Sequence, residues 1–208
     1  MRLLGSILLI FVTFISSSQE AFDEINNSYE ILLERIHQKD TVLNNRTKYY
    51  KCAEDISGRI EYYYDQGNLK LIMHIYKQGF GNNSFLENYF IQEDKLQLKT
   101  MISEEMFMNT LYKQSSQGVS STSVEKVAEV TEQRMLFESN NAPVCYERKH
   151  GAKLSEWDQE YFNSLTFQPG ECMEDNEDVK YKYRLLRKAE KKLESYSNRK
   201  PNCIFHMW

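Results

Sequence analysis

The sequence predicts an α+β fold, an antiparallel meander of about six strands with N-terminal and C-terminal helices packed on one face. Two kinds of periodicity lead to this prediction. Near both ends of the chain, apolar residues recur every three or four positions, which is typical of helices with one buried face. In the middle, apolar and polar residues alternate, which is typical of half-buried strands.

The first eighteen residues, MRLLGSILLIFVTFISSS, predict a secretory signal peptide, because one basic residue precedes an apolar run from Leu3 to Ile15. This run is shorter than the roughly 20 residues of a membrane-spanning helix, and polar Gln19 follows the serines. We therefore expect cleavage near Ser18 and a secreted or periplasmic chain, 19–208, that forms a single domain with no stable membrane span. An uncleaved anchor is the alternative.

The cysteines fit an exported chain. An even number of them predicts two structural disulfides, formed among Cys52, Cys145, Cys172 and Cys203. Their spacings of 93, 27 and 31 residues contain no Cys-x-x-Cys pair, so neither a thioredoxin-type redox site nor a zinc knuckle is indicated. Of the three pairings, we expect Cys52 with Cys145 and Cys172 with Cys203.

After the signal peptide, an apolar stripe predicts a helix that stops near Lys39. Its members follow one another at spacings of 3, 4, 3 and 4: Phe22, Ile25, Tyr29, Leu32 and Ile36.

The stretch GRIEYYYDQGNLKLIMHIY, 58–76, predicts a hairpin with a two-residue turn at Gln66 and Gly67. The expected pairs on its buried face are Tyr64 with Leu69, Tyr62 with Leu71 and Ile60 with Met73. Tyr63 is expected on the opposite face.

Two further hairpins are expected. In SFLENYFIQEDKLQLKTMI, 84–102, a turn at Glu93 and Asp94 sets Ile91 opposite Leu96 and Tyr89 opposite Leu98. The third lies in 124–148 and turns at about 139–142, with Pro143 at an edge or a strand start.

The remaining segments predict helices and a loop. SEEMFMNTLY, 103–112, predicts a short helix with Ser103 as N-cap, and the serine-rich 113–123 predicts a flexible surface loop. LSEWDQEYFNSL, 154–165, predicts a helix capped by Ser155. The final helix begins near Val179, with an apolar stripe formed by Val179, Tyr183, Leu186, Ala189, Leu193 and Tyr196.

The distribution of charge along the chain indicates which kinds of binding partner to expect. The 208-residue chain has a net charge of -4, which argues against a nucleic-acid partner. Residues 177–200 differ, because nine lysines and arginines stand there against four acids. Lys188 and Lys192 are therefore candidate surface-binding residues, although an unengaged, solvated helix face is the alternative.

Catalytic motifs are missing from the sequence. No two of the four histidines have the spacing of a helical zinc site, and neither Gly-x-Ser-x-Gly nor a nucleotide-binding glycine loop occurs. We predict no catalytic residue, metal or cofactor.

Aromatic residues expected off the core face suggest binding instead, because rigid exposed rings can stack on a ligand. This group comprises Tyr49, Tyr50, Tyr63, Tyr76 and Phe90, of which Tyr63, Tyr76 and Phe90 are the candidate surface-binding residues. The preference of tyrosine for strands is the alternative reading. Sequons at Asn26, Asn45 and Asn82 would permit N-glycosylation in a eukaryotic pathway.

The segments GRIEYYYDQGNLKLI, ENYFIQEDKLQLK and TEQRMLFE, within Ile56 to Arg148, resemble small exported bacterial proteins of unknown function built on tyrosine-rich hairpin meanders. YYYDQGNL also resembles one unit of a tyrosine-aspartate repeat shell. Neither resemblance brings catalytic residues with it.

The function expected from the sequence is an exported, non-enzymatic binding or interaction protein for an unknown protein or small-molecule ligand. One alternative is a small secreted hydrolase, in which Arg59, Glu61 and His74 would meet in a cleft. Another is a carrier of a hydrophobic ligand between the sheet and its helices.

Overall fold

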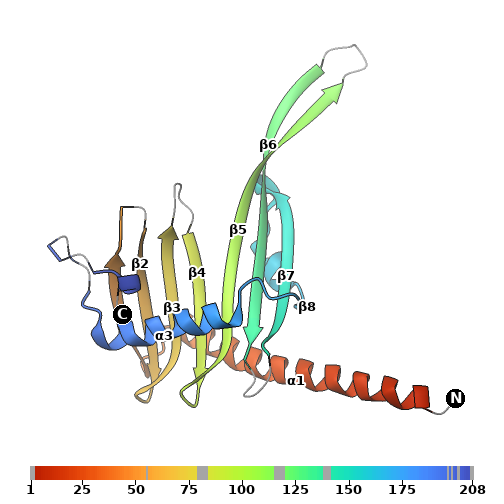
Figure 1. Ribbon diagram of the computed structural model, residues 1–208. Coiled ribbons are helices and arrows are strands. Elements are labelled where there is room, and N and C mark those ends of the chain that lie inside the picture. The colour runs from red at the N-terminus through yellow and green to blue at the C-terminus, as the bar shows by residue number, and fades with distance from the viewer. Residues whose placement is uncertain are drawn as a thin grey trace.

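The computed structural model of the protein describes residues 3–54, 56–78, 84–114, 120–137, 142–195, 197, 199–200 and 202–206. Figure 1 shows one broad sheet crossed by two helices. The elements, in chain order, are α1 (Leu3–His37), β1 (Leu43–Lys51), β2 (Ile56–Asp65), β3 (Asn68–Gln78), β4 (Ser84–Gln92), β5 (Lys95–Gln114), β6 (Ser120–Leu136), β7 (Val144–Lys153), η1 (Leu154–Glu156), α2 (Gln159–Ser164), β8 (Gln168–Gly170), α3 (Asn176–Lys192) and η2 (Ile204–His206).

The strands lie in the order β1 to β8, and each pairs antiparallel with its sequence neighbours. This confirms the α+β meander, with eight strands where the sequence pattern suggested about six. The strands that the sequence did not reveal include the two edges. Of the nine residues of β1 only Tyr50 is buried, and β8 has three residues, so neither gives an alternating pattern.

The helices pack on opposite faces of the sheet, which corrects the prediction that both lie on one face (Figure 1). Leu186 of α3 shares a core cluster with Tyr62 and Ile72, whereas Tyr29 of α1 shares another with Leu71. Neighbouring strand residues point to opposite faces, so two fully buried apolar neighbours such as Leu71 and Ile72 require cover on both sides.

Helix α1 packs through the predicted stripe. Phe22, Tyr29 and Leu32 are buried, Ile25 and Ile36 lie partly buried against the same cluster, and the helix ends at His37. The described side chains of this cluster begin at Ala21, beyond the predicted cleavage position, and the signal peptide stays a prediction. Among the described residues, no helix is both long and apolar enough to cross a bilayer.

The first two hairpins have the predicted turns. Both turn residues have positive φ in each: Gln66 at 50° and Gly67 at 82°, Glu93 at 50° and Asp94 at 61°. This is the backbone that two-residue hairpin turns with the twist of a sheet require. Beside the turns, the expected pairs Tyr64 with Leu69 and Ile91 with Leu96 are observed.

Past each turn, a β-bulge shifts the register by one residue. Tyr63 pairs with Leu71, and Phe90 pairs with Leu98 at the same place in the second hairpin. The extra residue of a bulge changes which residues face each other along the rest of the strand. The other expected pairs are therefore wrong: Tyr62 opposes Ile72, Ile60 opposes His74 and Tyr89 opposes Lys99.

Strands β5 and β6 extend beyond their neighbours as a projecting arm (Figure 1). The predicted helix over 103–112 is wrong, because Ser103 and the residues after it pair with β6 as a strand. Lys113, Gln114 and 120–123 of the predicted loop also belong to these strands, and 115–119 lie outside the described residues. The two strands of the third hairpin, β6 and β7, pair antiparallel, and Pro143 directly precedes β7; most of the predicted turn at 139–142 lies outside the described residues.

Two disulfides are present, but the expected partners are wrong. Cys52 is bonded to Cys203, and Cys145 is bonded to Cys172. Cys145 on β7 pairs in the sheet with Gly170 of β8, so Cys172 arrives beside it two residues later. The pairing therefore follows from β8, a strand that the sequence pattern did not reveal.

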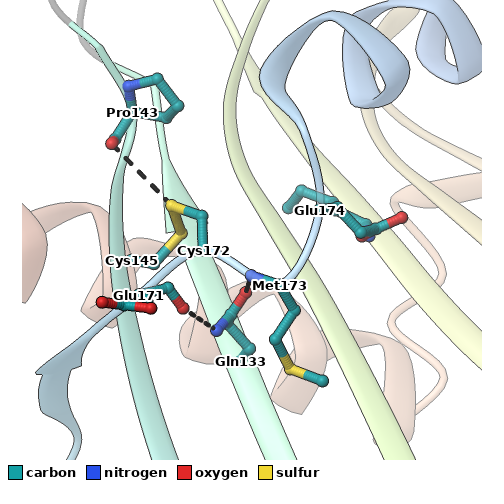
Figure 2. The surroundings of a disulfide bond; sticks show 8 residues. Gln133, Pro143, Cys145, Glu171, Cys172, Met173 and Glu174 are labelled. Carbon is teal, nitrogen blue, oxygen red and sulfur yellow. Dashed lines mark hydrogen bonds and ion pairs between the residues drawn. A yellow bond between two sulfur atoms is a disulfide. The ribbon is translucent and has the colours of Figure 1, made fainter.

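The chain on both sides of Cys172 is fixed to the sheet by Gln133 of β6 (Figure 2). The Gln133 side-chain amide donates to the Glu171 carbonyl at 2.8 Å and accepts from the Met173 N–H at 2.8 Å. Glu174 then forms an ion pair with Lys99 of β5. These contacts, together with the disulfide, determine where α3 begins.

Both C-terminal helices begin after an aspartate N-cap, and the predicted cap Ser155 is wrong. Ser155 lies in η1 and is not an N-cap; α2 begins after Asp158, whose carboxylate accepts from the N–H groups of Glu160 and Tyr161. Helix α3 begins after Asp175 and buries the predicted Val179, Leu186 and Ala189. Tyr196, the last member of the predicted stripe, lies outside the described residues.

Candidate binding surface

On the sheet face that α1 covers, residues of β1, β2 and β3 stand in rows across the strands. Tyr49, Arg59 and Ile75 form one row, and Lys51, Ser57 and Lys77 form the next row away from α1. Nearer the 65–68 turn, Tyr63 and Leu71 pack against the α1 cluster. Helix α1 therefore covers the turn end of these strands and leaves their opposite ends without a helix behind them (Figure 1).

The uncovered ends form a hollow of about 450 Å³. Five of its lining residues define what we call the Tyr49 surface: Tyr49, Lys51, Arg59, Ile75 and Lys77. Tyr49 is 50% exposed, and the Arg59 side chain is 47% exposed. An aromatic ring, an aliphatic side chain and three cations are thus presented together on three hydrogen-bonded strands, which hold them in fixed relative positions.

The Tyr49 surface is positively charged. It has three cations and one lining acid, Glu54. A second acid, Glu61, lies in the next row towards α1, and its Oε1 accepts from Arg59 Nε at 2.7 Å. The other Glu61 oxygen accepts from the Tyr63 hydroxyl at 2.8 Å. Burial, followed by this bond to Glu61, raises the pKa of Tyr63 to about 12, so the hydroxyl stays protonated and keeps Glu61 in place.

The backbone beneath the hollow depends on Gly58. A Cβ added there would lie 2.8 Å from the ring of Tyr50 and 2.7 Å from the Ile75 carbonyl oxygen, closer than non-bonded atoms approach. The missing side chain lets the Tyr50 ring pack directly against β2. The Tyr50 hydroxyl in turn lies 2.8 Å from His74 Nε2, which connects the hollow to a buried polar cluster on the other face.

Glu87 is the centre of this buried polar cluster. Only 1% of it is exposed, and its carboxylate accepts from Tyr76 OH at 3.0 Å, Tyr89 OH at 2.9 Å and Lys182 Nζ at 2.5 Å. His74 Nδ1 lies 3.5 Å away. Because Lys182 belongs to α3, the cluster fastens that helix to β3 and β4.

The charge states in the cluster follow from burial and from these contacts. Burial lowers the pKa of His74 below its ordinary value, so the ring is neutral at pH 7. Burial would raise the pKa of Glu87, but His74 and the ammonium groups of Lys182 and Lys99 outweigh it and hold the pKa well below its usual range. Glu87 is therefore a buried carboxylate.

The structure separates the predicted binding residues. Phe90 and Tyr76 are 3% and 8% exposed, so they are core residues and the prediction that they lie on the surface is wrong. Both faces of their strands are covered by a helix, which the sequence pattern did not reveal. Tyr63 is partly buried and lines a second hollow with Ile36 and Asn45. Lys188 is partly buried and Lys192 exposed on α3, on the other face of the sheet.

The Tyr49 surface was only partly visible in the sequence. Tyr49 was among the aromatics expected off the core face, but the lysines and Ile75 were not singled out. The signal that could have found them is their register across β1, β2 and β3, and β1 was not predicted.

The residues proposed for a hydrolase do not meet. Arg59 and Glu61 lie on the α1 face of β2, whereas His74 is buried on the α3 face of β3. In the part of the chain that the structure describes, no group of three or more metal-ligating side chains occurs.

The sequons occupy different settings. Asn26 lies on α1, where its amide oxygen accepts from Arg134, and Asn45 is exposed on β1. Asn82 lies outside the described residues.

Comparison of the chain with protein-family models, with curated proteins and with solved structures finds no match.

Proposed function

We propose that the chain is an exported, non-enzymatic binding protein and that the Tyr49 surface recognises its ligand. The observation that carries this proposal is the row of Tyr49, Arg59 and Ile75, which lines a hollow on the face of the sheet that α1 covers only at the other end of these strands. Export is supported by the apolar N-terminal run and by the two disulfides. The resemblance to exported bacterial proteins with tyrosine-rich hairpins stays a prediction.

A binding role fits the geometry better than the two alternatives. A carrier would need a dry apolar cavity, but the three hollows that include Lys51, Asp40 and Glu104 are each lined in part by charged residues. A hydrolase would need its acid and base side by side, whereas His74 and Glu61 face opposite sides of the sheet.

The chemistry of the surface favours an anionic ligand with a flat apolar face. Lysine and arginine bind carboxylates through charge-assisted hydrogen bonds, and a tyrosine ring stacks on planar or ring-shaped groups. Lys51 and Lys77 are two strand steps apart, or roughly 9.5 Å by the usual strand spacing. An acidic polysaccharide, with a carboxylate on successive sugar rings, meets these requirements, and we propose it as the ligand class.

The test is calorimetric titration of the exported, oxidised chain with polygalacturonate oligosaccharides, with neutral oligosaccharides of equal length as the comparison. We expect binding of the acidic sugars alone, and roughly tenfold weaker binding for Tyr49→Ala. Tyr161→Ala is the matched control, because Tyr161 is also 50% exposed but lies on α2. Equal binding of neutral sugars, or equal losses in both variants, would contradict the proposal.

A further inference from the structure

The open edge of β5 suggests an interaction that is separate from the Tyr49 surface. Strand β4 pairs with β5 only as far as Ile102, so Ser103–Gln114, which we call the β5 edge, has no described strand on that side. The peptide groups along such an edge alternate between facing the paired strand and facing outwards. An edge of this length is a ready template for another strand.

The middle of the β5 edge lacks the features that usually prevent pairing. Folded proteins protect exposed edges with proline, with charged residues or with short strands. Here the seven residues Met106–Tyr112 include no charge and no proline. Met106, Phe107 and Met108 are 62%, 49% and 69% exposed, although apolar side chains gain free energy when they are buried.

The other edge of the arm is different. Beyond Val127, where pairing with β7 ends, β6 consists of Ser120–Lys126, which is mainly serine, threonine and charged residues. The apolar residues of the arm are therefore concentrated on β5.

The sequence of the β5 edge is complementary to itself. When two copies of one strand pair antiparallel about a two-fold axis, directly opposite residues lie on the same face of the sheet. Residues on one face of a strand are an even number of positions apart, so the axis must pass through a single residue and not between two residues. A register centred on Asn109 sets Glu105 opposite Lys113 of the second copy, Phe107 opposite Leu111 and Met106 opposite Tyr112. Each pair occurs twice, so the two opposite-charge pairs lie outside the apolar pairs, and Asn109 lies opposite its own copy at the centre.

We infer that the partner of the β5 edge is a second copy of this chain, and that the two edges pair antiparallel about Asn109 into one continuous sheet. The dimer is isologous, since each copy contributes the same residues. The interface is small and the affinity is modest, because it rests on one strand pair.

The register is tested first by cysteine cross-linking of the exported, oxidised chain. All four native cysteines are in disulfides, so an introduced thiol is the only free one. Directly opposite residues of an antiparallel pair have Cα atoms roughly 4.5–5.5 Å apart, which is within reach of a disulfide. Asn109→Cys should therefore form a covalent dimer on oxidation. Met108→Cys is the matched control, because the two copies of position 108 are diagonal neighbours.

Sedimentation equilibrium over roughly 1 to 200 µM tests the association itself. We expect the average mass to rise towards that of a dimer, and Glu105→Lys to weaken the dimer roughly tenfold by opposing two cations. Within one chain Glu105 stands opposite Glu129, so this change removes a like-charge pair and leaves the arm folded. Lys113→Glu in the same chain should restore the association.

Three results would overturn the inference. They are a monomer at every concentration, equal cross-linking at positions 108 and 109, and a double variant that associates no better than Glu105→Lys alone.

Discussion

Replacement of Glu87 by leucine tests whether the buried cluster fastens α3 to the sheet. The change leaves the hydroxyls of Tyr76 and Tyr89 and the ammonium group of Lys182 without their shared acceptor. A buried polar group that loses its partner costs roughly 1–3 kcal/mol, and removal of one member of a buried ion pair costs roughly 3–5 kcal/mol. Because Lys182 is 20% exposed and can turn towards water, we expect a loss of about 3–5 kcal/mol in total.

The loss is measured as the free energy of unfolding in urea, followed by far-ultraviolet circular dichroism at pH 7. The midpoint should fall while the slope stays the same, since the surface exposed on unfolding hardly changes. Glu61→Leu is the control, because Glu61 also accepts two hydrogen bonds but from the partly exposed Arg59 and Tyr63. We expect it to cost about 1 kcal/mol. Equal losses in the two variants would refute the argument.

The pH dependence gives a second measure of the same group. The pKa of Glu87 is lower in the folded chain than in the unfolded chain, where it is roughly 4.3. Glu87 therefore stabilises the folded chain above roughly pH 4.3, and this stabilisation is lost as the pH falls below that value. The lowered pKa of His74 also makes the folded chain less stable as the pH falls, and this loss of stability begins as the pH falls through roughly 6.5. Glu87→Gln, which keeps the shape and removes the charge, should unfold less steeply with acid than the unchanged chain. An unaltered slope between pH 5 and 3 would show that Glu87 is not the group responsible.

Two further predictions concern the core. Leu71→Ser should destabilise the chain by about 2–4 kcal/mol and Tyr63→Ser by less, because Leu71 is fully buried beside α1 and Tyr63 is only partly buried; equal losses in urea titrations would show that the two side chains do not differ in burial. Burial raises the pKa of Tyr29 to about 12 and that of Tyr89 well above its usual value. Stability should therefore be lost as the pH rises above roughly 10, and absorbance at 295 nm should show these phenols ionising together with unfolding and not before it.

Local features of the sequence were the ones that predicted structure well. The turns at Gln66–Gly67 and Glu93–Asp94 depend on a few neighbouring residues, and the pairs beside them were correct. The bulges depend on how whole strands fit their neighbours, so the pairs beyond Tyr63 and Phe90 were not predictable from alternation.

Distant pairing explains the other errors. Residues 103–112 have the composition of a short helix, but pairing with β6 along their whole length makes them a strand. The disulfide partners depended on β8, which is too short to show a pattern. The Tyr49 surface depended on where α1 crosses the sheet, and the residues of α1 give its buried stripe but not its direction.

The Cys52–Cys203 bond has a mechanical consequence, because it joins the residue after β1 to the residue before η2 and encloses seven of the eight strands in a covalent ring. A force applied to the two ends of the chain is carried by the bond between the two sulfur atoms and does not act on residues 53–202. Stretching the oxidised protein would peel off α1 and β1 and then stop, at a length set by the residues outside the ring. The other seven strands would bear load only after a reductant had opened the bond.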